Sequence, residues 1–517
     1  MNHPLKGRIH GYRSDQTLWR WVFLASVVAL LAFRLPFLRD PAVWIDEAFS
    51  LYHARNSLKD IWGIGWQLES SPPLYYSANW AWTRFIGGAE PVARGLSLLL
   101  TALAALFVHR AGASLGGPRA GAVAALLFLC QPLMFVYSLE IRPYALQVLL
   151  IAAAVAGFGR VLAERELGRI RSPTTALSRV LPIVAAAALA TYTHSTTPVF
   201  LLALTGAAVV YGIARRENGP FWVAGALSAL AALLAITPQL LVMLEVIRTN
   251  ERGIGWIPSP DLRWVFVVSR SLAVGESTWN TPLTKLVGGM SVGLIAWSAW
   301  RVRARPLVLA VGLVLPALGF ACLGAVSLLQ PVLMPRTSLW VVVPLCVLVG
   351  CGVSTISWQG FRFGIMVALI VLPITLMSAI NMEGRTNDRP WPRFLAQLAR
   401  EAHATDEVVA VDKEVLCVLD YYRAGEPQRK RWRLERGPGK LYRSHQRIPL
   451  GCNEVEQLTV EQLSGRLSQG VGIWLLAGDD LQRRDIEAAL EVLGPSVKVI
   501  QRYDWRNQTV VWRVARQ

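Results

Sequence analysis

Residues 306–329 read PLVLAVGLVLPALGFACLGAVSLL, a run of twenty-four residues without one charged side chain. As an α-helix this run would be about 36 Å long, which exceeds the roughly 30 Å thickness of the hydrocarbon core of a bilayer. A helix that is apolar on every side lies in the core of a large protein or in a membrane, and this length favours the membrane. The stretch therefore predicts a membrane-spanning helix.

The same pattern recurs along the first three quarters of the chain. Of its 517 residues, 53% are hydrophobic and only 17% are charged, and the mean hydropathy is +0.39. Soluble proteins are about 45–50% apolar and about 25% charged, so an ordinary soluble enzyme is excluded. We predict a polytopic α-helical membrane protein with eleven spans, near residues 20–37, 92–110, 120–138, 143–162, 180–196, 198–214, 221–244, 284–300, 306–329, 337–357 and 363–381.

The positive charges are concentrated in the connections between the predicted spans, and this distribution indicates how the chain is oriented in the membrane. The net charge is +18, but residues 383–517 hold 22 Lys and Arg against 19 Asp and Glu, so +15 remains in the membrane part. Cytoplasmic connections are rich in Lys and Arg, which predicts a cytoplasmic N-terminus in a bacterial inner membrane and excludes a nucleic-acid partner. The basic connections hold Lys6, Arg8, Arg13 and Arg20, Arg110 and Arg119, the cluster 160–179, Arg215 and Arg216, Arg301, Arg303 and Arg305, and Arg362.

Two segments on the outer side are longer than connectors. In the first loop, 38–91, helical spacing from Leu58 to Trp66 and a start at Ser71-Pro72-Pro73 predict two helices on the membrane surface, with Ser71 as the cap. Residues 383–517 predict a soluble, periplasmic α/β domain beside a membrane domain of residues 1–382. Its expected strands are 407–411, 472–476, 497–503 and 509–514, and its expected helices are 415–422 and 481–493.

The six cysteines exclude a disulfide-dense scaffold, and neither a C-x-x-C nor an H-E-x-x-H spacing occurs. Cys417 and Cys452 both fall in the tail, where an oxidising periplasm would let them pair, although two free thiols are equally compatible. Cys130, Cys322, Cys346 and Cys351 fall in apolar spans, where we interpret them as small core residues.

Asp46 and Glu47 follow the first span, within DPAVWIDEAFS at 40–50. Adjacent side chains point in different directions on a helix or a strand, so we expect one carboxylate to face a cavity and the other to support it. A carboxylate at this depth would accept a proton from an attacking hydroxyl. The alternative is a solvated helix start.

The turn YSLEIRPY at 137–144 places Glu140 and Arg142 at the same outer depth. An arginine there can hold a phosphate with its planar fork of donors, whereas the alternative is a Glu140–Arg142 pair that ties the turn. His194 near the end of the fifth span and Arg336 before the tenth are further candidates, with a structural histidine and an interfacial anchor as the alternatives. GDD at 478–480 is interpreted as a helix cap, and no phosphate-binding loop for a nucleotide occurs.

Taken in order, Asp46-Glu47, SPPLYY at 71–76, ARGLS at 93–97 and YSLEIRPY at 137–144 resemble the membrane-embedded C-type glycosyltransferases. The similar members are bacterial relatives of the protein O-mannosyltransferases and of the aminoarabinose and galacturonic acid transferases that modify lipid A. The resemblance implies a transferase that passes a hexose or pentose from a polyprenyl-phosphate carrier to a glycan, lipid or protein acceptor on the outer face. Ser71, where relatives often carry histidine, and Thr337, where tyrosine is frequent, depart from the pattern.

The resemblance also implies roles for individual residues. Asp46 matches the catalytic aspartate and Glu47 its acidic neighbour. The expected phosphate-binding arginines are Arg142, Arg336, Arg94 and Arg55, and the expected supporting or substrate-binding residues are Glu140, Tyr144, His194 and Tyr75. The sequence does not decide whether a divalent metal is needed, because Asp46, Glu140 and His194 have the ligand types of a metal site and could equally form a polar cluster.

Two other classes of function remain as alternatives. A lipid or small-molecule transporter or flippase without catalysis would carry inverted repeats and charges near the span centres, and these midspans are almost free of charge. A partner-binding tail on a mere membrane anchor would not need eleven spans.

Overall fold

The computed structural model describes residues 5–39, 42–66, 72–170, 172–217, 219–249, 257–276, 281–356, 361–387, 391–403, 405–410, 418, 431–434, 457–477, 480–504 and 510–516. The chain forms two compact units. The first consists of residues 1–38 and 62–382, and the second of residues 39–61 and 383–517. Each unit is described by itself.

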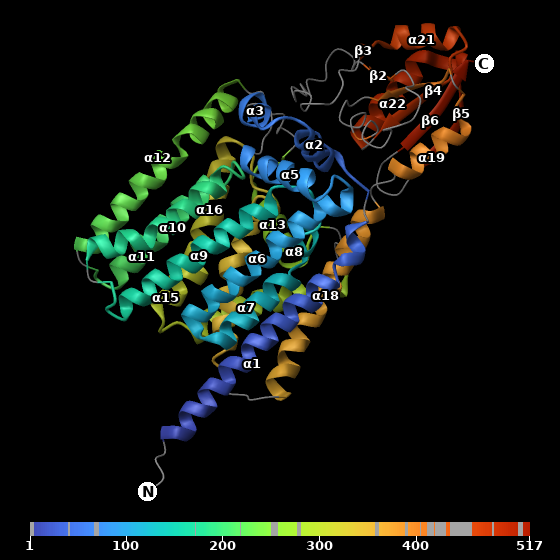
Figure 1. The fold of residues 1–517 in the computed structure, drawn as a ribbon. Helices are drawn as coiled ribbons and strands as arrows, with labels where there is room; N and C mark the ends of the chain where they lie inside the picture. Colours follow the sequence, from blue (N-terminus) through green and yellow to red (C-terminus); the bar gives the residue numbers. More distant parts are fainter. Residues whose placement is uncertain are drawn as a thin grey trace. The chain divides into compact units, whose positions relative to one another are not determined.

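The first unit is a bundle of apolar helices (Figure 1). In chain order it contains α1 (Leu5–Ala32), η1 (Leu35–Leu38), α5 (Pro73–Phe85), α6 (Glu90–Gly116), α7 (Pro118–Cys130), α8 (Pro132–Tyr137), α9 (Tyr144–Glu166), α10 (Pro173–Thr191), α11 (Pro198–Ala214), α12 (Gly219–Thr249), α13 (Leu262–Val274), α14 (Pro282–Arg301), α15 (Pro306–Leu309), η3 (Ala310–Val314), α16 (Leu315–Leu329), η4 (Leu339–Val341), α17 (Val342–Val353) and most of α18 (Phe361–Asn387).

Each of the eleven predicted runs is helical, which confirms a mainly helical fold. Within the described residues, five helices are long and apolar enough to cross a membrane. They are Glu90–Gly116, Tyr144–Glu166, Thr174–Thr191, Phe221–Glu245 and Pro306–Leu329. Five shorter apolar helices accompany them. The run 306–329 is one continuous helical path with a π-helical turn, η3, in its middle. The number of membrane crossings stays a prediction.

Glycines let the central helices approach one another closely. A Cβ built on Gly121 of α7 would lie 2.4 Å from the backbone oxygen of His109 on α6. A Cβ on Gly350 of α17 would lie 2.5 Å from the backbone oxygen of Ala120. Small residues at such crossings are how membrane helices gain packing contacts without a hydrophobic driving force from water. α6, α7 and α17 therefore form a tight centre on which the outer turns are built.

The first loop contains the predicted helices and one more. α2 (Ile45–Arg55) and α3 (Leu58–Asp60) fall in the second unit, the π-helical turn η2 (Ile61–Gly65) follows, and α5 begins at Pro73. Ser71 lies outside the described residues, and Pro72 occupies the cap position of α5, so the predicted serine cap is one residue too early. The fixed φ of proline suits both the cap and the first helical turn.

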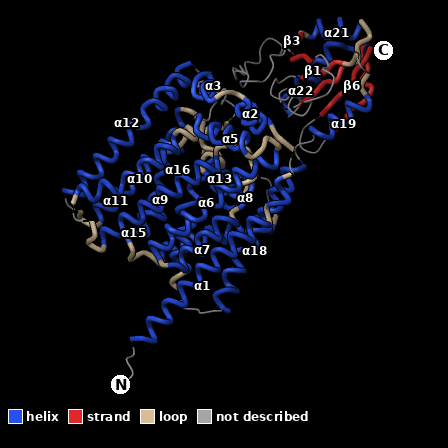
Figure 2. Tube along the Cα trace, in the orientation of Figure 1, coloured by secondary structure: helices blue, strands red, loops and turns tan. Residues whose placement is uncertain are grey.

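The second unit ends in a sheet of six strands in the order β3-β2-β1-β4-β6-β5. Strands β1 to β4 run parallel, whereas β6 is antiparallel to both β4 and β5. Figure 2 shows strands only in this C-terminal part of the described chain. The elements after α18 are α19 (Trp391–Glu401), β1 (Glu407–Ala410), β2 (Arg431–Leu434), β3 (Gln457–Leu458), α21 (Val460–Ser468), β4 (Ile473–Ala477), α22 (Asp480–Leu493), η5 (Gly494–Ser496), β5 (Val497–Asp504) and β6 (Val510–Arg516).

The small C-terminal α/β fold is thus confirmed, with all four predicted strands found. The prediction missed α19, β2, β3 and α21. The expected helix 415–422 lies outside the described residues except for Val418, and Cys417 and Cys452 lie outside them too. Cys130, Cys346 and Cys351 are buried and Cys322 is half-buried, all four as free thiols.

Candidate active site

The turn at 137–144 is anchored by a buried arginine from the end of the first helix. Arg34 is fully buried, and its Nε donates to Ser138 Oγ at 3.0 Å. Its Nη1 donates to the Leu30 oxygen at 2.8 Å, its Nη2 donates to the Leu129 oxygen, and its guanidinium lies 4.5 Å from the centre of the Phe135 ring. Because a guanidinium is planar and rigid, its hydrogen bonds fix the positions of the groups that accept them, so Arg34 holds the turn in one geometry.

Glu140 and Arg142 are both buried in this turn, with 3% and 4% of their surface exposed. Ser97 on α6 donates its hydroxyl to the backbone oxygen of Glu140. Arg142 donates from Nη1 to the hydroxyl of Tyr76 on α5 at 3.4 Å. The turn therefore joins α5 and α6 at the outer ends of α8 and α9, where a solvated surface loop would have left both charges exposed.

A row of aromatic rings runs from this turn to His194. The ring centres of Tyr137 and Tyr144 are 4.8 Å apart, and those of Tyr144 and His194 are 5.5 Å apart. The backbone N–H of Thr196 donates to His194 Nδ1 at 3.3 Å. In the neutral imidazole the proton then resides on Nε2, because one ring nitrogen accepts and the other donates. Tyr75 is also fully buried, with its ring 5.8 Å from that of Tyr76.

Glu276 is a site residue that the sequence did not single out. It follows α13, and its Oε1 accepts a hydrogen bond from the Tyr137 hydroxyl at 3.0 Å. Burial raises the pKa of Glu276, while the Tyr137 hydrogen bond and the positive charge of Arg336 act in the opposite direction. This brings Arg336, which is half-buried, into the electrostatic environment of the turn. In the sequence Glu276 was one of many acidic residues in outer connections, and no motif marks it.

Arg94 lies in the first turn of α6 and is fully buried. Its Nη1 donates to the backbone oxygen of Leu38, at the end of η1, at 3.1 Å. The structure therefore gives Arg94 a contact that fixes where the first loop leaves η1. Its expected contact with a phosphate stays a prediction.

The other three candidates belong to α2 in the second unit. Glu47 is fully buried, and its Oε2 accepts from the backbone N–H of Trp44 at 3.4 Å, across the start of the helix. Asp46 is half-buried. Arg55, in the last turn, is exposed and lies 5.3 Å from the centre of the Tyr52 ring. The two carboxylates thus differ in burial, as expected for neighbours that point apart.

Within the described ranges, no group of three or more His, Cys, Asp and Glu side chains stands close enough together to hold a metal ion. Glu140 and His194 belong to the first unit and Asp46 to the second. The expected set of Asp46, Glu140 and His194 stays a prediction, and the mechanism proposed below routes no step through a metal.

An apolar cavity of about 370 Å³ lies below the turns in the same unit. Its walls come from α7, α8, α13, α14, α16, α17 and α18 with η3 and η4. Among its lining residues, Ala273 precedes Glu276 by three residues in the chain, and Val341 follows Arg336 by five. The cavity volume lies in the range of roughly 300–1,000 Å³ that is typical of ligand pockets.

No protein-family model and no curated protein matches the chain. Among solved structures, ArnT from Cupriavidus metallidurans bound to undecaprenyl phosphate is similar with a TM-score of 0.57 and 15% sequence identity, over 96% of this chain and 98% of that chain. The same protein in the apo state gives a TM-score of 0.56 over the same shares, also at 15% identity. An oligosaccharyltransferase of Archaeoglobus fulgidus in the apo form overlaps more loosely, with a TM-score of 0.47 and 13% identity over 78% of this chain and 64% of that chain.

The ArnT structures show that this chain shares the fold of that protein along nearly its whole length. The resemblance that the ordered motifs predicted is confirmed at the level of the fold.

Proposed function

We propose that the protein is a glycosyltransferase that moves a hexose or pentose from a polyprenyl-phosphate carrier to an acceptor at the periplasmic face. One observation carries this proposal: Arg142 is held at the outer end of α9, in a buried turn, within a fold shared with a protein that binds undecaprenyl phosphate. A buried arginine is costly unless it has an anionic or hydrogen-bonding partner, and a phosphate is a suitable one. The acceptor is a glycan, a lipid or a protein.

The proposed reaction is a single displacement with inversion. The oxygen of the acceptor hydroxyl forms a bond to the anomeric carbon, and the bond from that carbon to the phosphate oxygen breaks. The bonding electrons leave with the polyprenyl phosphate, and the hydroxyl proton passes to a carboxylate. We assign that carboxylate to Asp46, because it is half-buried whereas Glu47 is fully buried and spans the start of α2.

The leaving phosphate requires cations more than it requires an acid. Arg142 contacts Tyr76 from within the turn, and Arg336 acts on Glu276, which the Tyr137 hydroxyl contacts. We assign these two arginines to the phosphate first. Arg94 and Arg55 are assigned as secondary contacts. Glu140, Tyr144, His194 and Tyr75 are assigned to orient the arginines and the sugar.

The carrier lipid also needs an apolar path. The cavity of about 370 Å³ is lined almost entirely by apolar side chains, and one of them, Ala273, is three residues from Glu276 in the chain. We assign the first isoprene units of the carrier to this cavity. This placement would keep the scissile bond at the level of the turns while the chain extends into the bilayer.

The choice of donor tests this function directly. The purified full chain is offered a set of polyprenyl-phosphate sugars in one series and the corresponding nucleotide sugars in another, with a mixed envelope extract as acceptor. We expect sugar transfer, measured with a radiolabelled sugar, from the lipid donors alone. Asp46→Asn serves as the inactive control. Efficient direct transfer from a nucleotide sugar would contradict the proposal, and so would transport of the lipid across vesicles without any transfer.

A further inference from the structure

A second cavity lies at the other end of the first unit. It measures about 330 Å³, and its walls come from α9, α10, α11 and α12, mostly with Leu, Val, Ile, Ala and Phe side chains. α9 begins next to Arg142 and has 23 residues, so its ends are about 34 Å apart. The cavity takes its α9 residues from Phe158 to Arg165, the far half of that helix. Its end at Arg165 therefore lies about 30 Å along α9 from Tyr144 at the candidate active site, which is about the thickness of a bilayer core.

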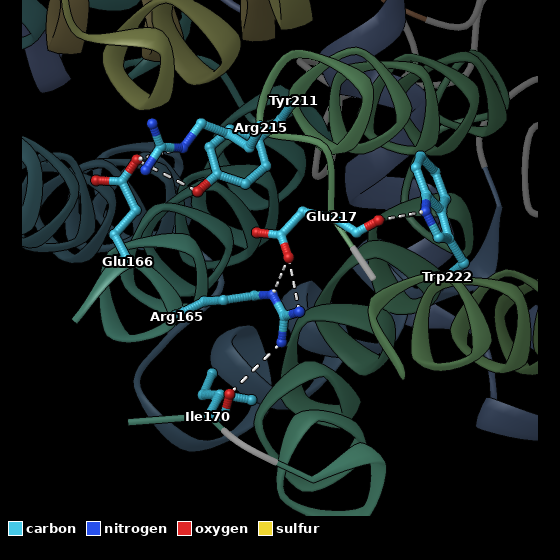
Figure 3. Close-up of polar contacts among 7 residues, drawn as sticks. All are labelled: Arg165, Glu166, Ile170, Tyr211, Arg215, Glu217 and Trp222. Atoms are coloured by element: carbon cyan, nitrogen blue, oxygen red, sulfur yellow. Dashed lines mark hydrogen bonds and ion pairs between the residues drawn. The ribbon is translucent and has the colours of Figure 1, made fainter. Parts of the chain in front are cut away.

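One end of this cavity is polar (Figure 3). Arg165 lines the cavity and meets Glu217 Oε2 with two nitrogens, Nε at 2.8 Å and Nη2 at 2.6 Å. Trp222 also lines the cavity and donates from Nε1 to the backbone oxygen of Glu217 at 3.1 Å. Beside this pair, Glu166 accepts from the Tyr211 hydroxyl at 3.3 Å and lies 3.7 Å from Arg215 Nε. The cavity is thus apolar along its length, with a charged and hydrogen-bonding rim.

The rim carries an excess of positive charge. Residues 160–179 and 215–217 together contain seven arginines and three glutamates, which leaves a net charge of +4. Two of these arginines are well exposed: 51% of the Arg179 side chain and 47% of the Arg215 side chain are accessible. Arg179 Nε lies 3.5 Å from Glu164, and Arg215 Nε lies 3.7 Å from Glu166. Each guanidinium still has an exposed side. The glutamates therefore order the rim without neutralising it.

The helices around the cavity also present apolar side chains outward. Leu181 on α10 and Leu227, Leu230 and Leu234 on α12 are each about half exposed or more. A Cβ built on Gly225, which lines the cavity from α12, would meet no atom within 4 Å. The cavity therefore has open space beside a surface that suits lipid chains rather than water.

We propose that this α9–α12 cavity binds an anionic glycerophospholipid, with one acyl chain between the four helices and the phosphate against Arg215 at the rim. An apolar slot would reject a nucleotide or a sugar phosphate, whereas a basic rim between membrane helices suits an acidic lipid headgroup. The indole of Trp222 and the phenol of Tyr211 provide the amphipathic side chains that are typical of the headgroup level. This site does not depend on the transferase function proposed above.

The acyl-chain part of the proposal is tested by filling the cavity. Gly225→Phe places a ring in the open space, and Gly289→Phe on α14 is the matched control, since a Cβ there also meets no atom within 4 Å and Gly289 does not line this cavity. Binding of palmitoyl-oleoyl-phosphatidylglycerol to the purified full chain is followed by native mass spectrometry. We expect Gly225→Phe to weaken binding about tenfold or more, because several buried methylenes are displaced. Gly289→Phe should bind as the unmodified chain does.

The headgroup part is tested by charge. Arg215→Ala should weaken binding of phosphatidylglycerol about fivefold, the effect of one arginine near a lipid phosphate. Binding of the phosphatidylcholine with the same chains should fall less, because its choline offsets the charge of the phosphate. Arg303→Ala is the control, because it removes an equal charge from the connection after α14, outside the cavity. Equal losses in both arginine variants would show diffuse attraction and overturn the headgroup assignment.

Thermal unfolding in detergent without added lipid checks that each variant folds, and Ala229→Leu, in the same wall, replaces Gly225→Phe if that variant is unstable. Unchanged phosphatidylglycerol binding in a folded, cavity-filled variant would overturn the site. Displacement of the lipid by inorganic phosphate alone would overturn the assignment of the acyl chain.

Discussion

Asp46 and Glu47 are adjacent in the chain but differ in environment, and this difference separates their expected roles. Glu47 accepts a backbone hydrogen bond at the start of α2, a job that an uncharged amide oxygen can also do. Asp46→Asn should lower turnover about 10²–10⁴-fold, because asparagine keeps the shape of aspartate but takes no proton. Turnover is measured with the lipid donor. Glu47→Gln is the matched control and should lose less than about tenfold.

Thermal unfolding of both variants should match the unmodified chain, since Asp46 is only half-buried and Gln retains the capping acceptor. An Asp46→Asn enzyme that keeps more than about a tenth of its turnover would move the base elsewhere, with Glu47 and Glu140 next in order.

Arg142 carries the second prediction for a single side chain. If it binds the carrier phosphate, Arg142→Ala should lower kcat/KM for the lipid donor about 10²-fold or more, and Arg142→Lys should recover only part of the loss. Lysine keeps the charge but lacks the two-pronged geometry that fits a phosphate. If Arg142 merely ties the turn to Glu140, the Ala variant should instead unfold at lower temperature, and removing Glu140 as well should restore its stability.

The residues of the site were predictable to different degrees. Asp46, Glu140 and Arg142 stand out because they belong to the ordered motifs that resemble the C-type glycosyltransferases. Glu276 and Arg34 do not stand out, since their importance comes from partners far away in the sequence. Tyr137 is 139 residues from Glu276, and Ser138 is 104 residues from Arg34. Arg34 lies within the predicted first span, 20–37, and the apolar run does not show that its guanidinium turns inward to Ser138.

The secondary structure was predictable wherever one periodicity extended over enough residues. The long apolar helices and the four longer strands satisfy this condition. β3 has only two residues. β2, between β1 and β3 in the sheet, reads RWRL, and its two arginines make it look unlike a buried strand. α21 has nine residues with a capping box at Thr459, a local signal that is easily missed in a polar tail. Short elements in the sheet domain are fixed by pairing with their neighbours, which the local sequence does not encode.

The contact between α19 and β5 provides a prediction on pH. The Tyr503 hydroxyl donates to a carboxylate oxygen of Glu401, and the Tyr503 ring stacks on that of Trp474 at 6.3 Å. This hydrogen bond is the main cause that lowers the pKa of Glu401, while burial and the same carboxylate raise the pKa of Tyr503 to about 12.

A lowered carboxyl pKa stabilises the fold above the unfolded value of 4.5 and loses that effect as pH falls through the folded value. A raised phenol pKa stabilises the fold below the unfolded value of 10.0 and loses that effect as pH rises through about 12. The unmodified chain should therefore unfold at a higher temperature than Tyr503→Phe at neutral pH, and the gap should narrow below pH 4.5. A gap that widens in acid would contradict this contact.

The distribution of charge over the whole chain makes the last prediction. The candidate turn and the basic α9–α12 rim lie at opposite ends of α9. The turn holds both carboxylates and arginines, whereas the rim has more arginines than glutamates. Basic connections tend to stay in the cytoplasm, which predicts that the turn and residues 383–517 lie on the periplasmic side. Alkaline phosphatase fused after Asn381 should therefore be active, and a fluorescent reporter that folds only in the cytoplasm should be dark at the same position.

Fusions after Arg216, in the basic rim, should give the reverse result and serve as the internal control. An inactive phosphatase after Asn381 together with a bright cytoplasmic reporter would refute the eleven-span topology, and with it the assignment of Asp46 and Arg142 to the side where a polyprenyl-linked sugar is consumed.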